Sequence, residues 1–228
     1  MPGFLKRYPD ADHAREALRR TCALRQHAIP TPAAVMGPDP ATLDFDRIEG
    51  DTGHALIGRD ILPLLAVVAG LHGAAVTKLP VYDPLLRIRP RLALTDDPLL
   101  RSIADGVVPT GKTVLHGDLH VGQFIRAVTG QVWIVDLDDL ALGPPEADFA
   151  NFVAHLATTD PSLSIADWAR IVLEHWRALG GTMDPSVFTR CLHLALLRRH
   201  LKLREVGRPD HFEGISAYLR DSSSFSMR

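Results

Sequence analysis

Two stretches of the sequence decide what this chain can be: "VLHGDLHVGQF" at residues 114–124 and "WIVDLDDLALG" at residues 133–143. In the first, Asp118 stands between two histidines at alternating positions, and a glycine and an amide side chain follow. In the second, an apolar run ends in a cluster of carboxylates. Apolar runs bounded by turn residues are typical of strands. We therefore expect a strand that leads into a loop with Asp118, followed by a hairpin that ends at the acidic cluster.

The composition is that of an ordinary globular protein. The chain has 228 residues, 46% of them hydrophobic and 23% charged, with a formal net charge of −2. This charge gives no general attraction to nucleic acid or to an anionic membrane, and we predict neither as a partner. The longest apolar run, at 61–76, is interrupted by proline, glycine and histidine, so it indicates a buried helix.

The sequence also predicts the location of the protein and the state of its cysteines. The first ten residues hold no apolar signal core, so we expect a cytoplasmic protein. Two cysteines, Cys22 and Cys191, are too few for a disulfide framework, and we expect both to be buried free thiols.

Apolar periodicity and turn residues predict the order of the elements. A small α+β part should come first, and "EGDTG" at 49–53 should be a flexible joint. A mostly helical part should follow, with one hairpin closed by a turn at Thr129 and Gly130. We thus predict an N-terminal lobe at 1–49, a C-terminal lobe at 50–220 and a disordered tail at 221–228. The predicted strands lie at 3–8, 34–36 and 42–48, and the predicted helices at 13–28, 57–76, 98–105, 147–157, 164–180 and 185–206.

The two opening stretches carry a family resemblance. "HGDLHVGQF" followed by "IVDLDDLALGPPEADFA" resembles the catalytic segment of the aminoglycoside phosphotransferase and choline kinase group, whose fold is similar to that of protein kinases. Four more segments, "FLKRY", "AREALRRTCALRQHAIPTPAAV", "LDFDRIEG" and "LAVVAGLHG", resemble the lysine strand, the following helix, the hinge and the helix before the catalytic loop. The resemblance covers roughly residues 3 to 160. It implies an α+β, protein-kinase-like fold with a small β-rich N-lobe and a large, mainly helical C-lobe.

The resemblance also implies an activity and a set of site residues. The activity is transfer of the γ-phosphate of ATP to a hydroxyl of a small molecule, with Mg²⁺. Such a reaction needs positioning, metal ions and a carboxylate that orients the hydroxyl. In this scheme Asp118 is catalytic, and His116, His120 and Asp148 support the catalytic loop. Gln123, Asp136 and Asp138 hold the metal, Lys6 and Glu16 serve the phosphates as an ion pair, and the hinge at Asp46, Arg47 and Ile48 receives adenine.

Two departures from the family pattern leave a second function open. Gln123 stands where the family has asparagine, and Mg²⁺ demands near-ideal octahedral geometry. Only five residues precede Lys6, so we expect the glycine-rich hairpin that covers the phosphates to be absent and the N-lobe to be truncated. Both departures favour a catalytically impaired, pseudokinase-like binding module. The strand at 3–8 would then be an exposed edge that forms a homodimer or accepts a partner strand, unless Lys6, Arg7 and Pro9 blunt it.

Other interpretations stay open from the residues alone. The alternation of His116, Asp118 and His120 is also compatible with a metal-dependent hydrolase. Arg15, Arg19 and Arg20 compete with Lys6 for Glu16, and Asp148 is equally explained as a helix N-terminal residue. The basic segment "LLRRHLKLRE" at 196–205 is typical of a solvated helix face, although it also suits an anionic partner or acceptor. Trp168 and Trp176 share a helix face, which suits core packing or an acceptor pocket. The sequence does not identify the acceptor.

Overall fold

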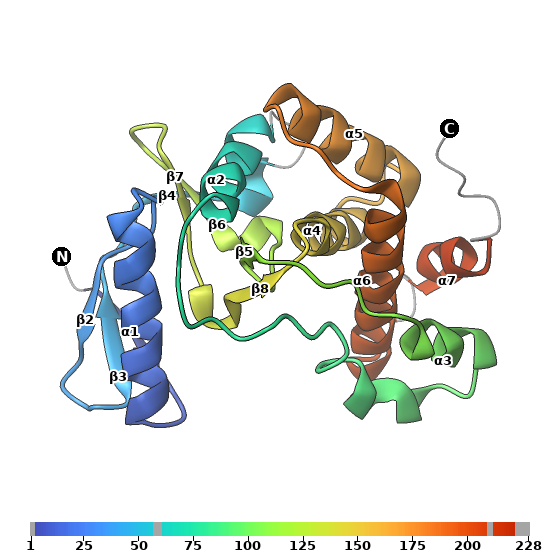
Figure 1. The fold of residues 1–228 in the computed structure, drawn as a ribbon, viewed down its shortest axis with the longest axis horizontal. Helices are drawn as coiled ribbons and strands as arrows, with labels where there is room; N and C mark the ends of the chain where they lie inside the picture. Colours follow the sequence, from blue (N-terminus) through green and yellow to red (C-terminus); the bar gives the residue numbers. More distant parts are fainter. Residues whose placement is uncertain (1–2, 57–60, 209–211, 222–228) are drawn as a thin grey trace. The chain divides into compact units, whose positions relative to one another are not determined.

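A computed structural model describes residues 3–56, 61–208 and 212–221 (Figure 1). The chain forms two compact units and enters each of them more than once. Unit 1 consists of Met1–Pro80, Val114–Gly117 and Val121–Ala141; unit 2 consists of Val81–Thr113, Asp118–His120 and Leu142–Arg228. The lobe boundaries at residues 49 and 220 stay predictions, and residues 222–228 of the predicted disordered tail lie outside the described residues.

The first sheet of unit 1 has three antiparallel strands in the order β1-β3-β2. The strands are β1 (Phe4–Arg7), β2 (Ala34–Met36) and β3 (Thr42–Phe45), and α1 (Ala11–Gln26) lies along the sheet (Figure 1). Helix α1 begins after Asp10, whose side chain accepts a hydrogen bond from the His13 N–H. Leu43 on the central strand packs with Tyr8, Ala14 and Ala17 in the core. The predicted helix and the predicted strand at 34–36 are confirmed here, and the predicted strands at 3–8 and 42–48 form as the shorter β1 and β3.

The second sheet of unit 1 contains the predicted hairpin. It consists of β6 (Phe124–Ala127) and β7 (Val132–Ile134), and Gly130 in the turn has a φ of +86°. The prediction of a flexible joint at 49–53 is wrong, because β4 (Gly50–Thr52) pairs with β6. A Cβ atom on Gly50 would lie 2.1 Å from the carbonyl oxygen of Arg126, so the close pairing needs glycine. After β4 the chain forms η1 (Gly53–Leu56), and α2 (Leu62–His72) packs on β7.

Short elements shape the loops around the two opening stretches. These elements are β5 (Thr113–Leu115), η3 (Val121–Gln123), η4 (Leu137–Asp139) and β8 (Ala141–Gly143). Gly117 follows β5 with a φ of +81°, and a Cβ atom there would lie 2.0 Å from the Asp139 carbonyl oxygen. Only glycine therefore suits the turn that leads into Asp118.

Unit 2 is built around α4 (Glu146–Thr159), which is buried over most of its length. Helix α4 packs against α5 (Ile165–Ala178) and α6 (Pro185–Glu205), and α6 also contacts η2 (Arg89–Leu94), α3 (Pro98–Asp105) and α7 (Phe212–Arg220) (Figure 1). Helix α7 was not predicted from the sequence. Trp168 and Trp176 are buried, and the Trp176 ring lies 4.6 Å from that of Phe149, so core packing is confirmed for both tryptophans.

The structure also bears on the cysteines, on membrane-spanning helices and on the edge strand. Both cysteines are free, and Cys191 is buried as predicted, but Cys22 is exposed. In the described residues, no helix has the length and apolar character that crossing a membrane requires. Strand β1 lies at an edge of its sheet with Phe4 and Leu5 exposed. Self-association through this edge stays a prediction.

The first sheet yields a stability prediction. Leu43 is fully buried, whereas Leu5 on the neighbouring strand is 54% exposed. We expect Leu43→Ala to lower the free energy of unfolding by about 2–5 kcal/mol, because it removes buried methyl groups and leaves a cavity. The matched change Leu5→Ala should cost less than about 0.5 kcal/mol. Urea titration followed by circular dichroism measures both, and equal losses would contradict the assigned packing.

Candidate functional site

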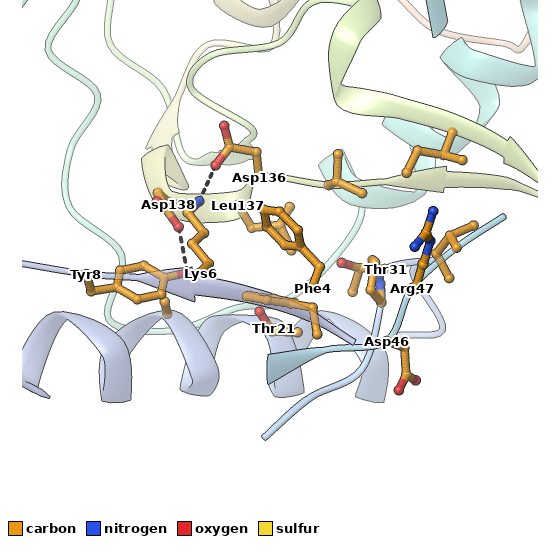
Figure 2. Close-up of a pocket in the computed structure, with 16 residues that line it drawn as sticks. Phe4, Lys6, Tyr8, Thr21, Thr31, Asp46, Arg47, Asp136, Leu137 and Asp138 are labelled. Atoms are coloured by element: carbon orange, nitrogen blue, oxygen red, sulfur yellow. Dashed lines mark hydrogen bonds and ion pairs between the residues drawn. The ribbon is translucent and has the colours of Figure 1, made fainter. Parts of the chain in front are cut away.

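A cavity of about 530 Å³ lies within unit 1. It is lined by side chains from β1, α1, the end of β3, β6 and the turn after β7 (Figure 2). Six residues predicted from the sequence line this one cavity: Lys6, Asp46, Arg47, Ile48, Asp136 and Asp138. Its size is in the range of small-molecule sites. The structure therefore brings most of the predicted nucleotide and metal residues together.

The ammonium group of Lys6 lies between two carboxylates in this cavity (Figure 2). Its Nζ atom is 2.5 Å from Asp136 Oδ1 and 2.7 Å from Asp138 Oδ2. Burial alone lowers the pKa of Lys6, but the hydrogen bonds and charges of Asp136 and Asp138 outweigh it, so the net pKa is raised. The Tyr8 hydroxyl donates to Asp138 Oδ1 at 3.2 Å, and Lys6 Nζ lies 5.4 Å from the centre of the Tyr8 ring. This arrangement keeps Lys6 charged.

The backbone after β7 explains why two carboxylates meet at one point. If the strand continued past Asp136, the side chains of Asp136 and Asp138 would share a face. The strand ends instead at Ile134, and Asp136 adopts a left-handed conformation with φ 59° and ψ 62°. Aspartate is one of the few non-glycine residues that tolerate this region. The chain then turns into η4, which carries Asp138 back to the same lysine.

Gln123 and His116 hold the segment around Asp136. Gln123 is buried, and its side-chain N–H donates to Asp136 Oδ2 at 3.2 Å. The fully buried His116 ring forms a hydrogen bond of 3.0 Å with the Val135 carbonyl oxygen. Burial raises the pKa of Asp136, but Lys6 and then Gln123 and His116 outweigh this effect and lower it. Asp136 is thus a stable carboxylate at pH 7.

The residues of this cavity fit a divalent cation of the Mg²⁺ type. Asp136 and Asp138 already converge on one cationic atom, and Gln123 contributes an amide beside them. Carboxylate and amide oxygens are the ligands that such hard cations take. Gln123 would have to turn its amide oxygen, rather than its N–H, toward the ion.

Glu16 does not pair with Lys6, so this part of the prediction is wrong for the described structure. Its carboxylate instead binds Arg19 at 2.6 Å and Arg20 at 3.0 Å. Both arginines lie one turn further along the same helix, where side chains naturally meet. The hydrogen bond from Arg19, followed by that from Arg20, lowers the pKa of Glu16 to about 2 despite partial burial. Arg20 also donates to the Asp138 carbonyl oxygen at 2.8 Å. Through this arginine, Glu16 supports the turn that carries Asp136 and Asp138, here called the acidic turn.

The predicted hinge presents backbone groups to the same cavity. The Asp46 N–H donates to the Ala33 carbonyl oxygen at 2.8 Å. Within the described part of the chain, no hydrogen bond engages the N–H groups of Arg47 and Ile48. The Asp46 carboxylate points away from Lys6 and the acidic turn (Figure 2). Backbone groups, rather than the side chain of Asp46, are therefore the polar contacts that this segment offers.

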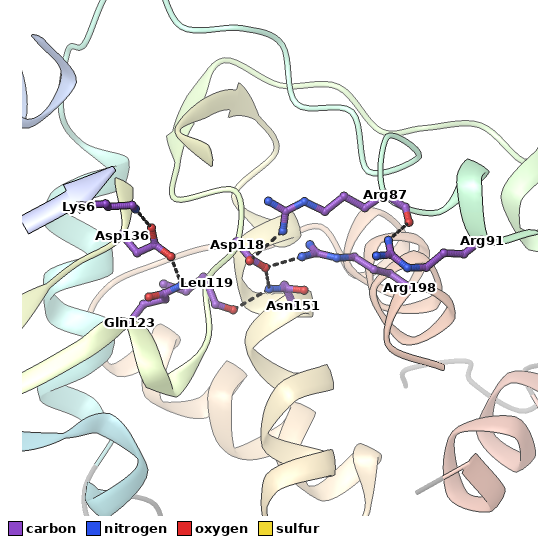
Figure 3. Close-up of polar contacts among 9 residues, drawn as sticks. All are labelled: Lys6, Arg87, Arg91, Asp118, Leu119, Gln123, Asp136, Asn151 and Arg198. Atoms are coloured by element: carbon purple, nitrogen blue, oxygen red, sulfur yellow. Dashed lines mark hydrogen bonds and ion pairs between the residues drawn. The ribbon is translucent and has the colours of Figure 1, made fainter. Parts of the chain in front are cut away.

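Asp118 lies in unit 2, where arginines surround it (Figure 3). Its Oδ2 is 2.9 Å from Arg87 Nη1, and its Oδ1 is 2.7 Å from Arg198 Nη2. The Asn151 amide donates to the same Oδ1 at 3.3 Å and to the Leu119 carbonyl oxygen at 2.8 Å. Burial alone raises the pKa of Asp118, but Arg198 and Arg87 outweigh it and hold the pKa well below its usual range.

Three partners of Asp118 escaped the sequence analysis, namely Arg87, Asn151 and Arg198. Asn151 could have been predicted as a site residue, because it follows Asp148 by one helical turn next to a segment that matched the family pattern. Arg198 belongs to the basic segment at 196–205, and the prediction of a solvated face is wrong for it, since its side chain is only 19% exposed. Arg87 lies in a stretch with no periodic signal.

The remaining supporting residues have identifiable surroundings in unit 2. The His120 ring stacks on His155, with ring centres 4.5 Å apart. Asp148 is almost fully buried in the first turn of α4. In the part of the chain that the structure describes, no group of three or more His, Cys, Asp and Glu side chains is arranged to hold a metal ion. The metal-dependent hydrolase alternative thus receives no support from the geometry.

Comparison with solved structures identifies the fold. The aminoglycoside phosphotransferase APH(3'')-Id from Streptomyces rimosus, solved with ADP and streptomycin, has a TM-score of 0.63 at 21% identity, and the match covers 85% of each chain. The choline kinase LicA from Streptococcus pneumoniae has a TM-score of 0.68 at 13% identity, covering 95% of this chain and 85% of that one. The amicoumacin kinase hAmiN, solved with AMP-PNP, Ca²⁺ and its ligand, has a TM-score of 0.66 at 13% identity, covering 92% and 78%. The predicted α+β, kinase-like fold class is confirmed.

A search of curated proteins gave no match. A sequence model of the phosphotransferase enzyme family, APH, matches residues 3–184. This range contains the lysine strand, the acidic turn and the loop that carries Asp118. The chain therefore belongs to the phosphotransferase enzyme family.

Proposed function

We propose that this protein transfers the γ-phosphoryl group of ATP to a hydroxyl group of a small molecule. The observation that carries the proposal is the cavity of unit 1, in which Lys6, Asp136 and Asp138 meet beside the hinge in a chain of the phosphotransferase family. Two structural relatives were solved with ADP or AMP-PNP, one of them with Ca²⁺, which supports a nucleotide and a divalent cation as ligands.

The nucleotide would occupy the unit 1 cavity with its phosphates at Lys6. A lysine ammonium is a compact charge suited to phosphate oxygens. The adenine ring would lie against the apolar wall formed by Phe45, Ile48 and Leu137, with the backbone of Arg47 and Ile48 as hydrogen-bond partners. Asp136 and Asp138, with Gln123, would hold Mg²⁺, which neutralises phosphate charge when bound. Lys6 would exchange its two carboxylates for the phosphates.

Asp118 would orient the acceptor hydroxyl. The hydroxyl oxygen forms the new bond to the γ-phosphorus while the bond from that phosphorus to the β-phosphate oxygen breaks, and ADP leaves. The hydroxyl proton passes to Asp118 and then to solvent. Since Arg198 and Arg87 lower the pKa of Asp118 against burial, it is a weak base. A weak base suffices, because the loose transition state of phosphoryl transfer demands orientation more than early deprotonation. The scheme requires Asp118 and Asp136 to converge on the γ-phosphate, and this convergence stays a prediction.

A second candidate is a binding module that takes the nucleotide without transferring phosphate. The position of Gln123 favours it, because the amide presents its N–H to Asp136 where a metal ligand would present oxygen. Wild-type protein distinguishes the two functions. A phosphotransferase consumes Mg·ATP in the presence of its acceptor, whereas the binding module is stabilised by Mg·ATP and never yields ADP. Absence of any stabilisation at millimolar Mg·ATP would refute both.

Asp118→Asn tests the catalytic assignment. We expect kcat to fall by roughly 10²–10⁴-fold, the usual contribution of a positioned acid–base group. Nucleotide affinity should stay the same, because Asp118 is assigned to the acceptor. The matched control is Asp83→Asn, which removes another carboxylate of unit 2 from an ion pair, that with Arg89 at 3.2 Å. Steady-state kinetics measure the effect, and equal losses in the two variants would contradict the assignment.

Lys6→Gln tests the nucleotide cavity. We expect ATP affinity to fall by about 10–100-fold, the range expected for losing a hydrogen bond to a charged group. Binding of Mg²⁺ alone should not weaken, because Asp136 and Asp138 lose a competing cation. Lys112→Gln is the control, since Lys112 is exposed and lines neither this cavity nor that around Asp118. Isothermal titration calorimetry measures both ligands, and unchanged ATP affinity in Lys6→Gln would remove the assignment.

A further inference from the structure

We propose that the acceptor is an anionic hydroxyl compound and that a basic cavity in unit 2 binds its phosphate or carboxylate group. The inference rests on the proposed function and adds the chemical class of the second substrate. It is carried by an excess of cationic side chains around Asp118, the residue assigned to the acceptor hydroxyl.

The cavity has a volume of about 380 Å³ and lies wholly within unit 2. Asp118 and Asn151 form part of its wall, so whatever fills it meets the catalytic carboxylate. Five cationic side chains line it: Arg87, Arg91, Arg198, Arg199 and Lys202. Three of the five come from α6, where they recur at the spacing of one helix face.

Among the described residues, the cationic side chains in the wall of this cavity outnumber the carboxylates that bind them. Asp118 is the one carboxylate in the wall of the cavity, and it binds Arg87 and Arg198. Glu205, outside the wall, binds Arg91 at 3.1 Å and Lys202 at 2.8 Å. Among the described residues, these ion pairs join two carboxylates to four of the five cations.

Arg199 has no carboxylate partner among the described residues. Its Nε donates to the Thr158 hydroxyl at 3.0 Å, and its side chain is partly buried. Burial, followed by the charges of Arg198 and Arg208, lowers the pKa of Arg199, although the charge of Asp118 opposes this shift. Partial burial of a cation that no described carboxylate contacts is costly, and an anion in the cavity would reduce that cost.

His155 adds a polar but uncharged group to the same wall. Burial, with the nearby charges of Arg199 and His120, lowers the pKa of His155 well below its ordinary value, so the ring is neutral at pH 7. A neutral imidazole both donates and accepts hydrogen bonds, which suits a ligand with hydroxyl and anionic oxygens.

The charge excess disfavours other classes of acceptor. An amine-bearing compound would place its charge among five like charges, with a single carboxylate in the wall to bind it. A neutral sugar would supply no anionic partner for Arg199. Arginine guanidinium groups are suited to phosphate and carboxylate, since their N–H fork matches two oxygens of one anion.

An anionic acceptor would also prepare Asp118 for its role. Arg87 and Arg198 hold both carboxylate oxygens of Asp118 in the described structure. When an anion draws these two guanidinium groups to itself, an Asp118 oxygen becomes accessible to the acceptor hydroxyl. Substrate charge and catalytic orientation would then be linked through the same two arginines.

The test measures binding in the absence of nucleotide, so that it does not depend on phosphoryl transfer. Four compounds share a three-carbon hydroxyl scaffold and differ in charge: glycerol 3-phosphate, glycerate, glycerol and 3-aminopropane-1,2-diol. Titration calorimetry or NMR of arginine Nε–H groups reports their affinity. We expect one or both anionic compounds to bind and the neutral and cationic ones not to bind. Glycerol 3-phosphate and glycerate distinguish a phosphate from a carboxylate site.

Variants locate the binding. Arg199→Gln should weaken binding of the anionic compound on the order of tenfold, the effect of losing one hydrogen bond to a charged group. Arg91→Gln is a second variant in case the first folds poorly, and neither residue contacts Asp118. Arg204→Gln is the matched control, because Arg204 is exposed on the same helix and lies outside the cavity wall.

Three results would overturn the inference: binding of the amine as tight as that of an anion, no anion binding at tens of millimolar, or an equal effect of Arg204→Gln and Arg199→Gln. Failures of the two proposals remain distinguishable. Anion binding without phosphoryl transfer would refute the proposed function alone. Transfer to a neutral or cationic hydroxyl compound, without anion binding, would refute the present inference alone.

Discussion

The ion pairs of Lys6 with Asp136 and Asp138 are the contact on which the interpretation of unit 1 depends. They connect β1 to the turn after β7, two segments that are 130 residues apart in the sequence. Two partly buried carboxylates at one point would repel each other, and the ammonium removes that repulsion. Under the proposed function, a divalent cation would also remove this repulsion. Asp136 has a left-handed backbone conformation, which is unfavourable for most non-glycine residues. It stands in the turn that brings the carboxylates of Asp136 and Asp138 to the same ammonium group.

The cavities of the two units have opposite charge balances. In the unit 1 cavity, two acids share one lysine, which under the proposed function would exchange them for nucleotide phosphates. In the unit 2 cavity, five cations surround one acid, and the imbalance calls for negative charge from a ligand. In both places the side chains assigned to chemistry are bound to protein partners that a ligand would replace. Protein partners thus compensate these charges as long as no ligand is bound.

Sequence reasoning succeeded where the signal was local. The first helix and the turn at Gly130 depend on signals within a few residues, and both predicted elements formed. It failed where a strand or a side chain depends on a partner that is far away in the sequence. Strand β4 has three residues and no apolar alternation, so only its pairing with β6 makes it a strand. Arg87 and Arg198 are 31 and 80 residues from Asp118, and no spacing rule connects them to it. The predicted Lys6–Glu16 ion pair did not form, because Arg19 and Arg20 lie on the same helix within reach of Glu16.

Family membership constrains unit 1 more strongly than unit 2. The lysine strand and the carboxylates after a strand are local motifs that could be recognised in one sequence. The structural relatives include a protein solved with streptomycin and a choline kinase, so their small molecules differ, and the sequence of this chain did not identify an acceptor. For such a pocket, the net charge of the residues that line it is more informative than the name of the family. The inference of an anionic acceptor therefore rests on Arg198, Arg199 and Lys202 on α6 and not on a structural relative.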